Sequence, residues 1–92
     1  MIARRIVVEG RVQGVGFRDA MCTSAHIHRV RGWVRNRRDG RVEALVQGDD
    51  EAVALVIAWA RRGPPAARVD RIDIDEARVD EGLRGFAATA TV

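Results

Sequence analysis

The chain has 92 residues, of which 47% are hydrophobic, and it carries a single cysteine and a formal net charge of +3. This length provides one small core, so we expect residues 1–92 to form a single domain. The lone cysteine excludes an internal disulfide, and no apolar run is long enough for a signal peptide or a membrane span. We therefore expect a cytoplasmic protein. The positive charge favours anionic ligands but does not indicate nucleic acid.

The first predicted strand, Arg4 to Glu9, leads into the glycine-rich stretch GRVQGVGFR at residues 10–18. Its three glycines relax the φ limits of the backbone, so several N–H groups can point at one anion. A helix predicted over residues 19–29 adds unpaired N–H groups and the positive end of its dipole. Arg18 carries a planar charged fork that suits phosphate oxygens. The stretch predicts a phosphate site made of Arg18 and the loop residues Gln13, Gly14, Val15, Gly16 and Phe17.

The spacing of this loop excludes two common nucleotide-binding motifs. Three residues separate Gly10 from Gly14, whereas a P-loop has four between its glycines and a lysine after them, and this chain contains no lysine. A dinucleotide fingerprint needs a third glycine where Asp19 stands. We therefore expect the loop to hold a small phosphate group.

A hairpin is predicted after the first helix. Strands are expected at residues 31–38 and 41–47, and Asp39-Gly40 between them is typical of a type I′ turn. In the second of these strands the apolar alternation predicts a core face of Val42, Ala44 and Val46. In the first helix the helical period predicts a core face of Phe17, Ala20, Met21, Ser24, Ala25 and His28.

A second helix is expected to begin at Asp49 or Asp50 and to end at Gly63, a left-handed cap before two prolines. Two more strands follow, at residues 69–76 and 84–92. This order predicts an α+β, ferredoxin-like βαββαβ sandwich with an extra C-terminal strand, and with two helices packed on one face of a mixed or antiparallel sheet.

Three segments together carry a resemblance to a known family: GRVQGVGFR, GWVRN at residues 32–36 and DGRVE at residues 39–43. The chain resembles the acylphosphatases from about Ile6 to Phe86. The resemblance implies hydrolysis of the carboxyl–phosphate bond of small acyl phosphates to carboxylate and inorganic phosphate, with no metal or other cofactor. It also implies that Arg18 binds phosphate and that Asn36 orients the attacking water. Phosphate or sulfate would bind as a product-like ion, and we expect a monomer.

The residue types suit this chemistry. An acyl phosphate is already activated, so its hydrolysis needs positioning and charge stabilisation more than a covalent nucleophile. The Asn36 amide offers both an acceptor and donors, which can hold a water and a phosphate oxygen. His26 and His28 do not face each other on a helix, so their spacing does not predict a metal site.

The end of the first helix departs from the family pattern. Acylphosphatases usually have Leu-Gly there, and this chain has His28-Arg29. A residue other than glycine in a left-handed cap costs on the order of 1 kcal/mol. A histidine on the core face needs a hydrogen-bond partner or must stay neutral. We therefore expect strain at this helix end.

Two other functions stay open. One is a non-catalytic ferredoxin-like module that binds RNA or another anion. RNA-binding sheets stack bases on exposed aromatic residues, and only Trp33 lies in a predicted central strand. The other is a domain of a larger carbamoyl-transferring maturation protein. Because the chain begins with Met1 and ends within its last strand, we expect a free-standing enzyme.

Overall fold

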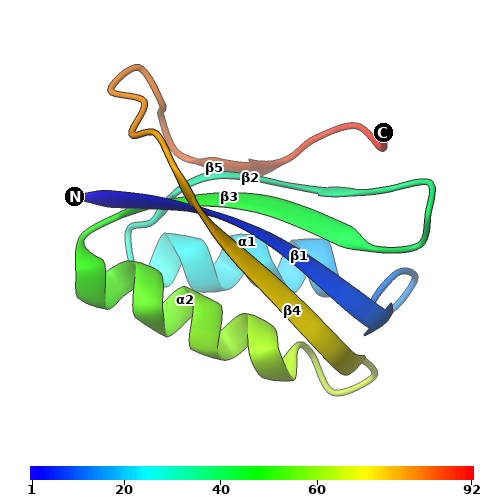
Figure 1. Ribbon diagram of the computed structural model, residues 1–92. Helices are drawn as coiled ribbons and strands as arrows, with labels where there is room; N and C mark the ends of the chain where they lie inside the picture. The colour runs from blue at the N-terminus through cyan, green and yellow to red at the C-terminus, as the bar shows by residue number, and fades with distance from the viewer.

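The computed structural model describes all of residues 1–92, as five strands and two helices (Figure 1). In chain order these are β1 (Ile2–Arg11), α1 (Phe17–Ile27), β2 (Arg31–Asn36), β3 (Val42–Gly48), α2 (Asp50–Arg62), β4 (Arg68–Ala77) and β5 (Phe86–Ala88). The strands form one sheet in the order β4-β1-β3-β2-β5, in which only the β2–β5 pair is parallel. Both helices lie against the same face of the sheet. The predicted ferredoxin-like fold with an extra C-terminal strand is confirmed.

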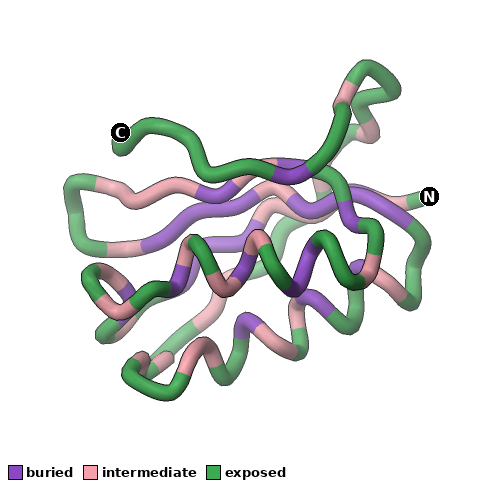
Figure 2. The backbone as a smooth tube through the Cα atoms, turned by 180° about the vertical axis from the view of Figure 1, so that it is seen from behind, coloured by how far each residue is buried: buried purple, intermediate pink, exposed green.

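The core fills the space between this sheet and the two helices (Figure 2). Alternation along β3 turns Val42, Ala44 and Val46 toward the helices, and each is at most 1% exposed, as predicted. The buried helical residues are Phe17, Met21, Ser24 and Ala25 in α1 and Val53, Val56 and Ala60 in α2. Ala20 and His28, also predicted for the core face of α1, are only half-buried, because they lie at the edge of that face. Neither helix has the length and apolar character needed to span a membrane.

The opposite face of the sheet holds a buried carboxylate. Glu43 is 3% exposed and is bound by the guanidinium groups of Arg5 and Arg35, the latter through Nε at 2.8 Å. Burial acts to raise the pKa of the Glu43 carboxyl, but hydrogen bonds and charge from Arg35 and Arg5 outweigh it. The pKa therefore lies below its ordinary value. Such pairing is what allows a carboxylate to be buried here.

A second buried polar side chain closes another part of this face. Gln47 has no exposed surface, and it exchanges two hydrogen bonds of 2.8 Å with the backbone N–H and C=O of Asp80. The loop after β4 is thereby fixed over β3. No helix covers this face of the sheet, and paired polar groups close it in two places.

The predicted boundaries of all elements but the last strand lie within two residues of the observed ones. α1 begins at Phe17 and ends at Ile27, two residues earlier at each end than predicted, since Gly16 is its N-cap. The predicted strand at residues 84–92 is wrong in length, because β5 contains only Phe86–Ala88. The chain beyond β5 still follows β2, with a 3.1 Å hydrogen bond from Val92 N to Asn36 O.

Two predicted turn conformations are also wrong in detail. A type I′ turn requires positive φ at both central residues, but of Asp39 and Gly40 only Gly40 has it, at 93°. The hairpin connection spans residues 37–41, and the Asp39 carboxylate accepts a 3.0 Å hydrogen bond from Arg41 N within it. Gly63 has φ 69° and ψ −174°. This conformation lies outside the left-handed helical region and is essentially restricted to glycine.

The end of α1 shows the expected strain. Arg29 is the one residue other than glycine with positive φ, at 57°. Its N–H donates to His26 O at 3.2 Å, and Val30 N donates to Ala25 O at 2.8 Å. These two bonds form the Schellman arrangement that ordinarily has glycine at this position. The left-handed conformation of Arg29 is therefore retained by hydrogen bonds and by the burial of Val30.

Candidate active site

The connection between β1 and α1 is shaped by two glycines. Gly14 and Gly16 have φ of 72° and 79°, values that side-chain-bearing residues adopt only with strain. Space is not the constraint, since a Cβ at either position would meet no atom within 4 Å. Both glycines are therefore required for the backbone conformation of the loop and not for space around it. Gly10 differs: it lies in β1 at a register shift, and a Cβ there would come within 2.2 Å of Arg68 O in β4.

The backbone N–H groups of this connection have no protein acceptors. None of the amides from Gln13 to Gly16 donates a hydrogen bond within the protein. The first backbone hydrogen bond of α1 runs from Ala20 N to Gly16 O at 3.1 Å. The amides of residues 17–19 therefore have no partner within the helix, and Gly16 offers no capping side chain. Unpaired amides at a helix N-terminus favour an anion.

A hollow of about 240 Å³ opens at this place. It exceeds several-fold the volume that one water occupies in the liquid, about 30 Å³, so it has room for a tetrahedral anion and a water. Its lining joins the connection and the first turn of α1 to the end of β2. The lining residues are Val12, Gly14, Gly16, Phe17, Arg18, Asp19 and Asn36.

Arg18 and Asn36 come from different elements and line the same hollow. Arg18 lies in the first turn of α1, is half-buried, and forms no ion pair or hydrogen bond through its side chain. Asn36 is the last residue of β2, and its Oδ1 is a buried acceptor without a partner. Leaving a buried acceptor unpaired costs about 1–3 kcal/mol. Both side chains are thus uncommitted within the protein.

Two of the predicted loop residues, Gln13 and Val15, direct their side chains away from the hollow. The side chain of Gln13 is turned to the hairpin, where Nε2 donates to Arg37 O at 2.7 Å and to Arg41 O at 3.0 Å. Val15 is half-buried and packs against the core. Neither side chain lines the hollow, whereas the predicted residues Gly14, Gly16, Phe17, Arg18 and Asn36 all do. Gln13 instead ties the loop to the hairpin that carries Asn36.

Two lining residues were not predicted from the sequence, Val12 and Asp19. Asp19 is exposed and brings a carboxylate to the rim of a hollow whose other charged side chain is Arg18. The available signal was its position in the first turn of α1, directly after Arg18, since first-turn side chains lie beside the helix N-terminus.

The hairpin beside the hollow is held by charged pairs. The Arg41 guanidinium hydrogen-bonds to Asp39 at 2.7 Å, and together with the Arg41 N–H it holds the pKa of that carboxyl at about 2. On the other face of β2, the Arg35 guanidinium lies 4.5 Å from the centroid of the Trp33 ring. Because Arg35 covers this ring, it is not a free platform for base stacking.

The fold and the hollow together define a class: a small ferredoxin-like domain that presents unpaired amides, a free guanidinium and a free carboxamide to one anion-sized site. Comparison with known proteins makes this more specific. The family model described as Acylphosphatase matches residues 4–88. The acylphosphatase of Thiobacillus denitrificans is 61% identical over 69 residues, which are 75% of this chain and 78% of the relative. The chain belongs to the acylphosphatase family, and its enzymatic class is that of an acylphosphatase acting on an acyl phosphate.

Solved structures agree. The crystal structure of acylphosphatase from Bacillus subtilis is 40% identical and superposes with a TM-score of 0.92, covering 97% of this chain and 99% of that one. The chain is also similar to part of a larger protein. The crystal structure of HypF from T. kodakarensis is 38% identical with a TM-score of 0.84, and the match covers 97% of this chain but 12% of that one.

Proposed function

We propose that this chain hydrolyses small acyl phosphates by holding the phosphoryl group on the loop amides and Arg18, while Asn36 directs a water at phosphorus. The observation that supports this best is that three uncommitted groups occur around one hollow: the unpaired amides of the lining residues Gly14 and Gly16 to Asp19, the Arg18 guanidinium and the Asn36 carboxamide. Each is a hydrogen-bonding group that the protein itself leaves free.

The loop amides and Arg18 are suited to stabilising the negative charge of the transition state. In phosphoryl transfer negative charge is spread over the phosphoryl oxygens, and catalysis depends on positioning and on fixed electrostatic stabilisation. Backbone amides held by Gly14 and Gly16 need no reorganisation during the reaction. The guanidinium of Arg18 adds a positive charge in a geometry that can bind two oxygens at once. Removing one such donor typically costs about 10²–10³ in turnover.

Asn36 is suited to orienting the attacking water. Its Oδ1 can accept a hydrogen bond from an O–H of the attacking water, while its amide N–H groups can donate to a phosphoryl oxygen. The water oxygen bonds to phosphorus as the P–O bond to the acyl group breaks, and the carboxylate leaves with the electron pair. An amide is not a base at neutral pH, so the proton of the water passes to a phosphoryl oxygen of the substrate. Carboxylate and inorganic phosphate result.

Three variants test this assignment. In Arg18→Ala we expect the affinity for inorganic phosphate, measured by calorimetry, to fall about 100-fold or more. In Asn36→Ala we expect phosphate affinity to change little while kcat for a generic acyl phosphate falls about 100-fold. Arg11→Ala removes the same charge from an exposed position at the end of β1, and serves as the control with both properties retained.

The decisive comparison is between substrates. Phosphate release is measured with the acyl phosphate and with an ordinary phosphate ester, whose alkoxide is a much poorer leaving group than a carboxylate. We expect hydrolysis of the acyl phosphate alone. Equal rates on both substrates, or wild-type hydrolysis in both Arg18→Ala and Asn36→Ala, would refute the proposal.

A further inference from the structure

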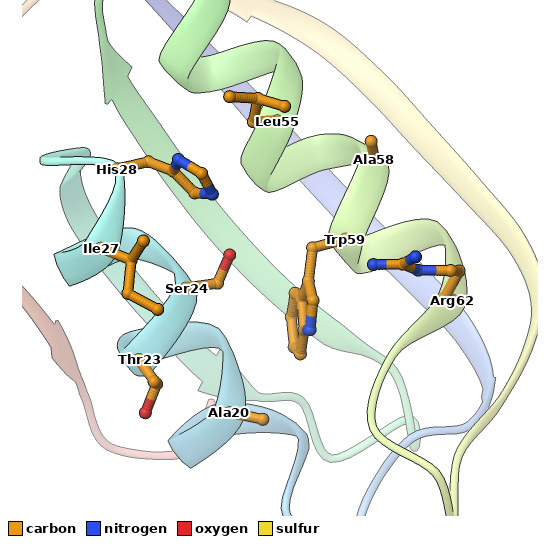
Figure 3. Close-up of a pocket in the computed structure, with 9 residues that line it drawn as sticks. All are labelled: Ala20, Thr23, Ser24, Ile27, His28, Leu55, Ala58, Trp59 and Arg62. Carbon is orange, nitrogen blue, oxygen red and sulfur yellow. The ribbon is translucent and has the colours of Figure 1, made fainter.

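A larger hollow, of about 800 Å³, lies away from the anion site in a groove between α1 and α2 (Figure 3). Its volume is within the range of small-molecule sites, about 300–1,000 Å³. One wall comes from α1 and its C-cap, between Ala20 and His28, and the other from α2, between Leu55 and Arg62. We call this hollow the interhelical groove, and the mechanism above makes no use of it.

The groove exposes large apolar side chains. Ile27 is 70% exposed and Leu55 is 52% exposed. Figure 3 shows the indole of Trp59 between the two helices, with Leu55 one turn before it on α2. Covering such side chains is favourable by about 25 cal/mol for each Å² of apolar surface removed from water. The body of a ligand bound here is therefore apolar.

The ionisable side chains that line the groove are all basic. Its lining contains Arg62 and His28 but no aspartate or glutamate. Arg62 forms no ion pair with any residue, and Figure 3 shows its guanidinium beside Trp59 and the His28 ring directed from α1 toward α2. A free guanidinium next to apolar surface complements a carboxylate attached to an apolar body.

The groove shares a wall with the anion site. Phe17 lines the anion hollow, Trp59 lines the groove, and the two rings are in contact, with centroids 5.2 Å apart and an interplanar angle of 54°. The indole of Trp59 therefore lies where it can report on ligands in the groove. The two sites are adjacent, but they are lined by different residues.

We propose that the interhelical groove binds an apolar monocarboxylate, with its carboxylate on Arg62 and its apolar body along Leu55 and Trp59. This is the chemical class of acid that hydrolysis of an apolar acyl phosphate releases. The link to the reaction product rests on the proposed function, whereas the binding site rests on the groove alone. The acid occupies a site separate from the phosphate that leaves with it.

Tryptophan fluorescence can test the binding directly. Trp33 and Trp59 are the two tryptophans of the chain, so Trp33→Phe leaves Trp59 as the sole emitter. In this background, titration with benzoate at pH 7 and constant ionic strength should give a saturable change with Kd on the order of 1 mM, as small-ligand efficiency implies. Benzamide, which has the same shape without the charge, should bind about tenfold more weakly.

Matched variants locate the site. Arg62→Gln should weaken benzoate binding about tenfold. Arg61→Gln removes the same charge from the same last turn of α2, but Arg61 does not line the groove, so affinity should stay unchanged. Leu55→Ala should weaken binding through the apolar body. Arg18→Gln should abolish phosphate binding and leave benzoate binding intact.

Several outcomes would overturn the proposal: no saturable change, equal effects of Arg61→Gln and Arg62→Gln, or loss of benzoate binding in Arg18→Gln. Dimerisation through Leu55 in sedimentation experiments, with no benzoate binding, would assign the groove to a second copy of the chain instead. The two proposals fail separately. Acyl phosphate hydrolysis without benzoate binding contradicts the groove alone, and benzoate binding without hydrolysis contradicts the proposed function alone.

Discussion

The two helices begin in opposite ways. α2 starts after Asp49 and carries Asp50 and Glu51 in its first turn, so three carboxylates of the chain lie at its positive end. α1 starts after Gly16, which offers no side chain, and its first turn carries Arg18 with a single carboxylate, Asp19. Neither N-cap makes a side-chain hydrogen bond. The difference is in charge: the chain compensates the dipole of α2 itself and leaves that of α1 for an external anion.

The helices also end differently. The C-cap of α2 is Gly63, in a conformation essentially restricted to glycine, and two prolines follow. α1 ends with Arg29 in a left-handed conformation that glycine would adopt at lower cost. α2 thus has a strong sequence signal at both ends, while α1 has one at neither. The helix with weak conventional signals is the one that carries the candidate active site, which suggests where local sequence rules are relaxed for function.

The largest expected effect on phosphate affinity comes from placing an aspartate at the N-cap of α1, as at the N-cap of α2. In Gly16→Asp a carboxylate occupies the free amides and opposes a bound anion. We expect phosphate affinity, measured by calorimetry, to fall about 100-fold, since like charges about 5 Å apart repel by about 3 kcal/mol at an effective dielectric constant of 20. The reciprocal change Asp49→Gly should leave phosphate affinity unaltered. Equal phosphate binding by Gly16→Asp and the wild type would contradict the contrast between the helix starts.

A side chain at the C-cap of α2, Gly63, should lower the stability of the protein. In Gly63→Ala the new Cβ would lie 3.0 Å from Phe17 Cε2 and 3.1 Å from Ala67 Cβ, at a φ of 69°. We expect a loss of about 2 kcal/mol in unfolding free energy, measured by urea denaturation. Gly40→Ala is the control for backbone strain alone, because it has φ 93° but no atom within 4 Å of its Cβ. It should therefore lose less than Gly63→Ala.

The end of α1 should be open to improvement. Arg29→Gly removes the strain of a left-handed arginine while retaining the Schellman hydrogen bonds. We expect a gain of about 1 kcal/mol in stability, which for a domain of this size is a rise in Tm of about 4–8 °C by calorimetry. Arg31→Gly, two residues later in β2, should be destabilising. A fall in Tm for Arg29→Gly would show that the arginine side chain contributes more than its strain costs.

The smallest expected effect concerns the single acid of α1. Burial first, and then the charge of Asp19, raise the pKa of the Cys22 thiol above its ordinary value of 9.0. Because the thiolate forms only as pH rises toward this pKa, the raised pKa slows any reaction of Cys22 that requires the thiolate. In Asp19→Asn we expect faster alkylation of Cys22 by iodoacetamide at pH 8 and phosphate binding about threefold tighter. Asp50→Asn, in the first turn of α2, should change neither.

Particular residues show how far the sequence could be read. The alternation of Val42, Ala44 and Val46 predicted the core face of β3 correctly, because a strand repeats every two residues. The burial of Glu43 and Gln47 on the other face of the same strand was not predicted. Their partners, Arg5, Arg35 and Asp80, come from other parts of the chain and meet them only after the sheet has assembled.

The contacts of Gln13, within the candidate site, also depend on residues distant in the sequence. Its glycine-rich surroundings predicted a loop that could hold phosphate, and on that basis Gln13 was counted among the loop residues of the phosphate site. The carbonyls that it contacts lie 24 and 28 residues further along the chain, in the hairpin. No local pattern indicates such a partner. Asn36 was assigned a role through family resemblance, and its place in the same hollow as Arg18 depends on how β2 is held in the sheet by its pairing with β3.

The order of elements, the fold class and the presence of an anion-adapted loop could all be read along the chain, because hydrophobic period and backbone φ limits are properties of neighbouring residues. Four features could not be read in this way. They are the shape of the hollow, the position of Asp19 at its rim, the hydrogen bonds of Gln13 to the hairpin and the interhelical groove. Each of these depends on distances between residues of separate elements, and those distances are set by packing of the whole domain.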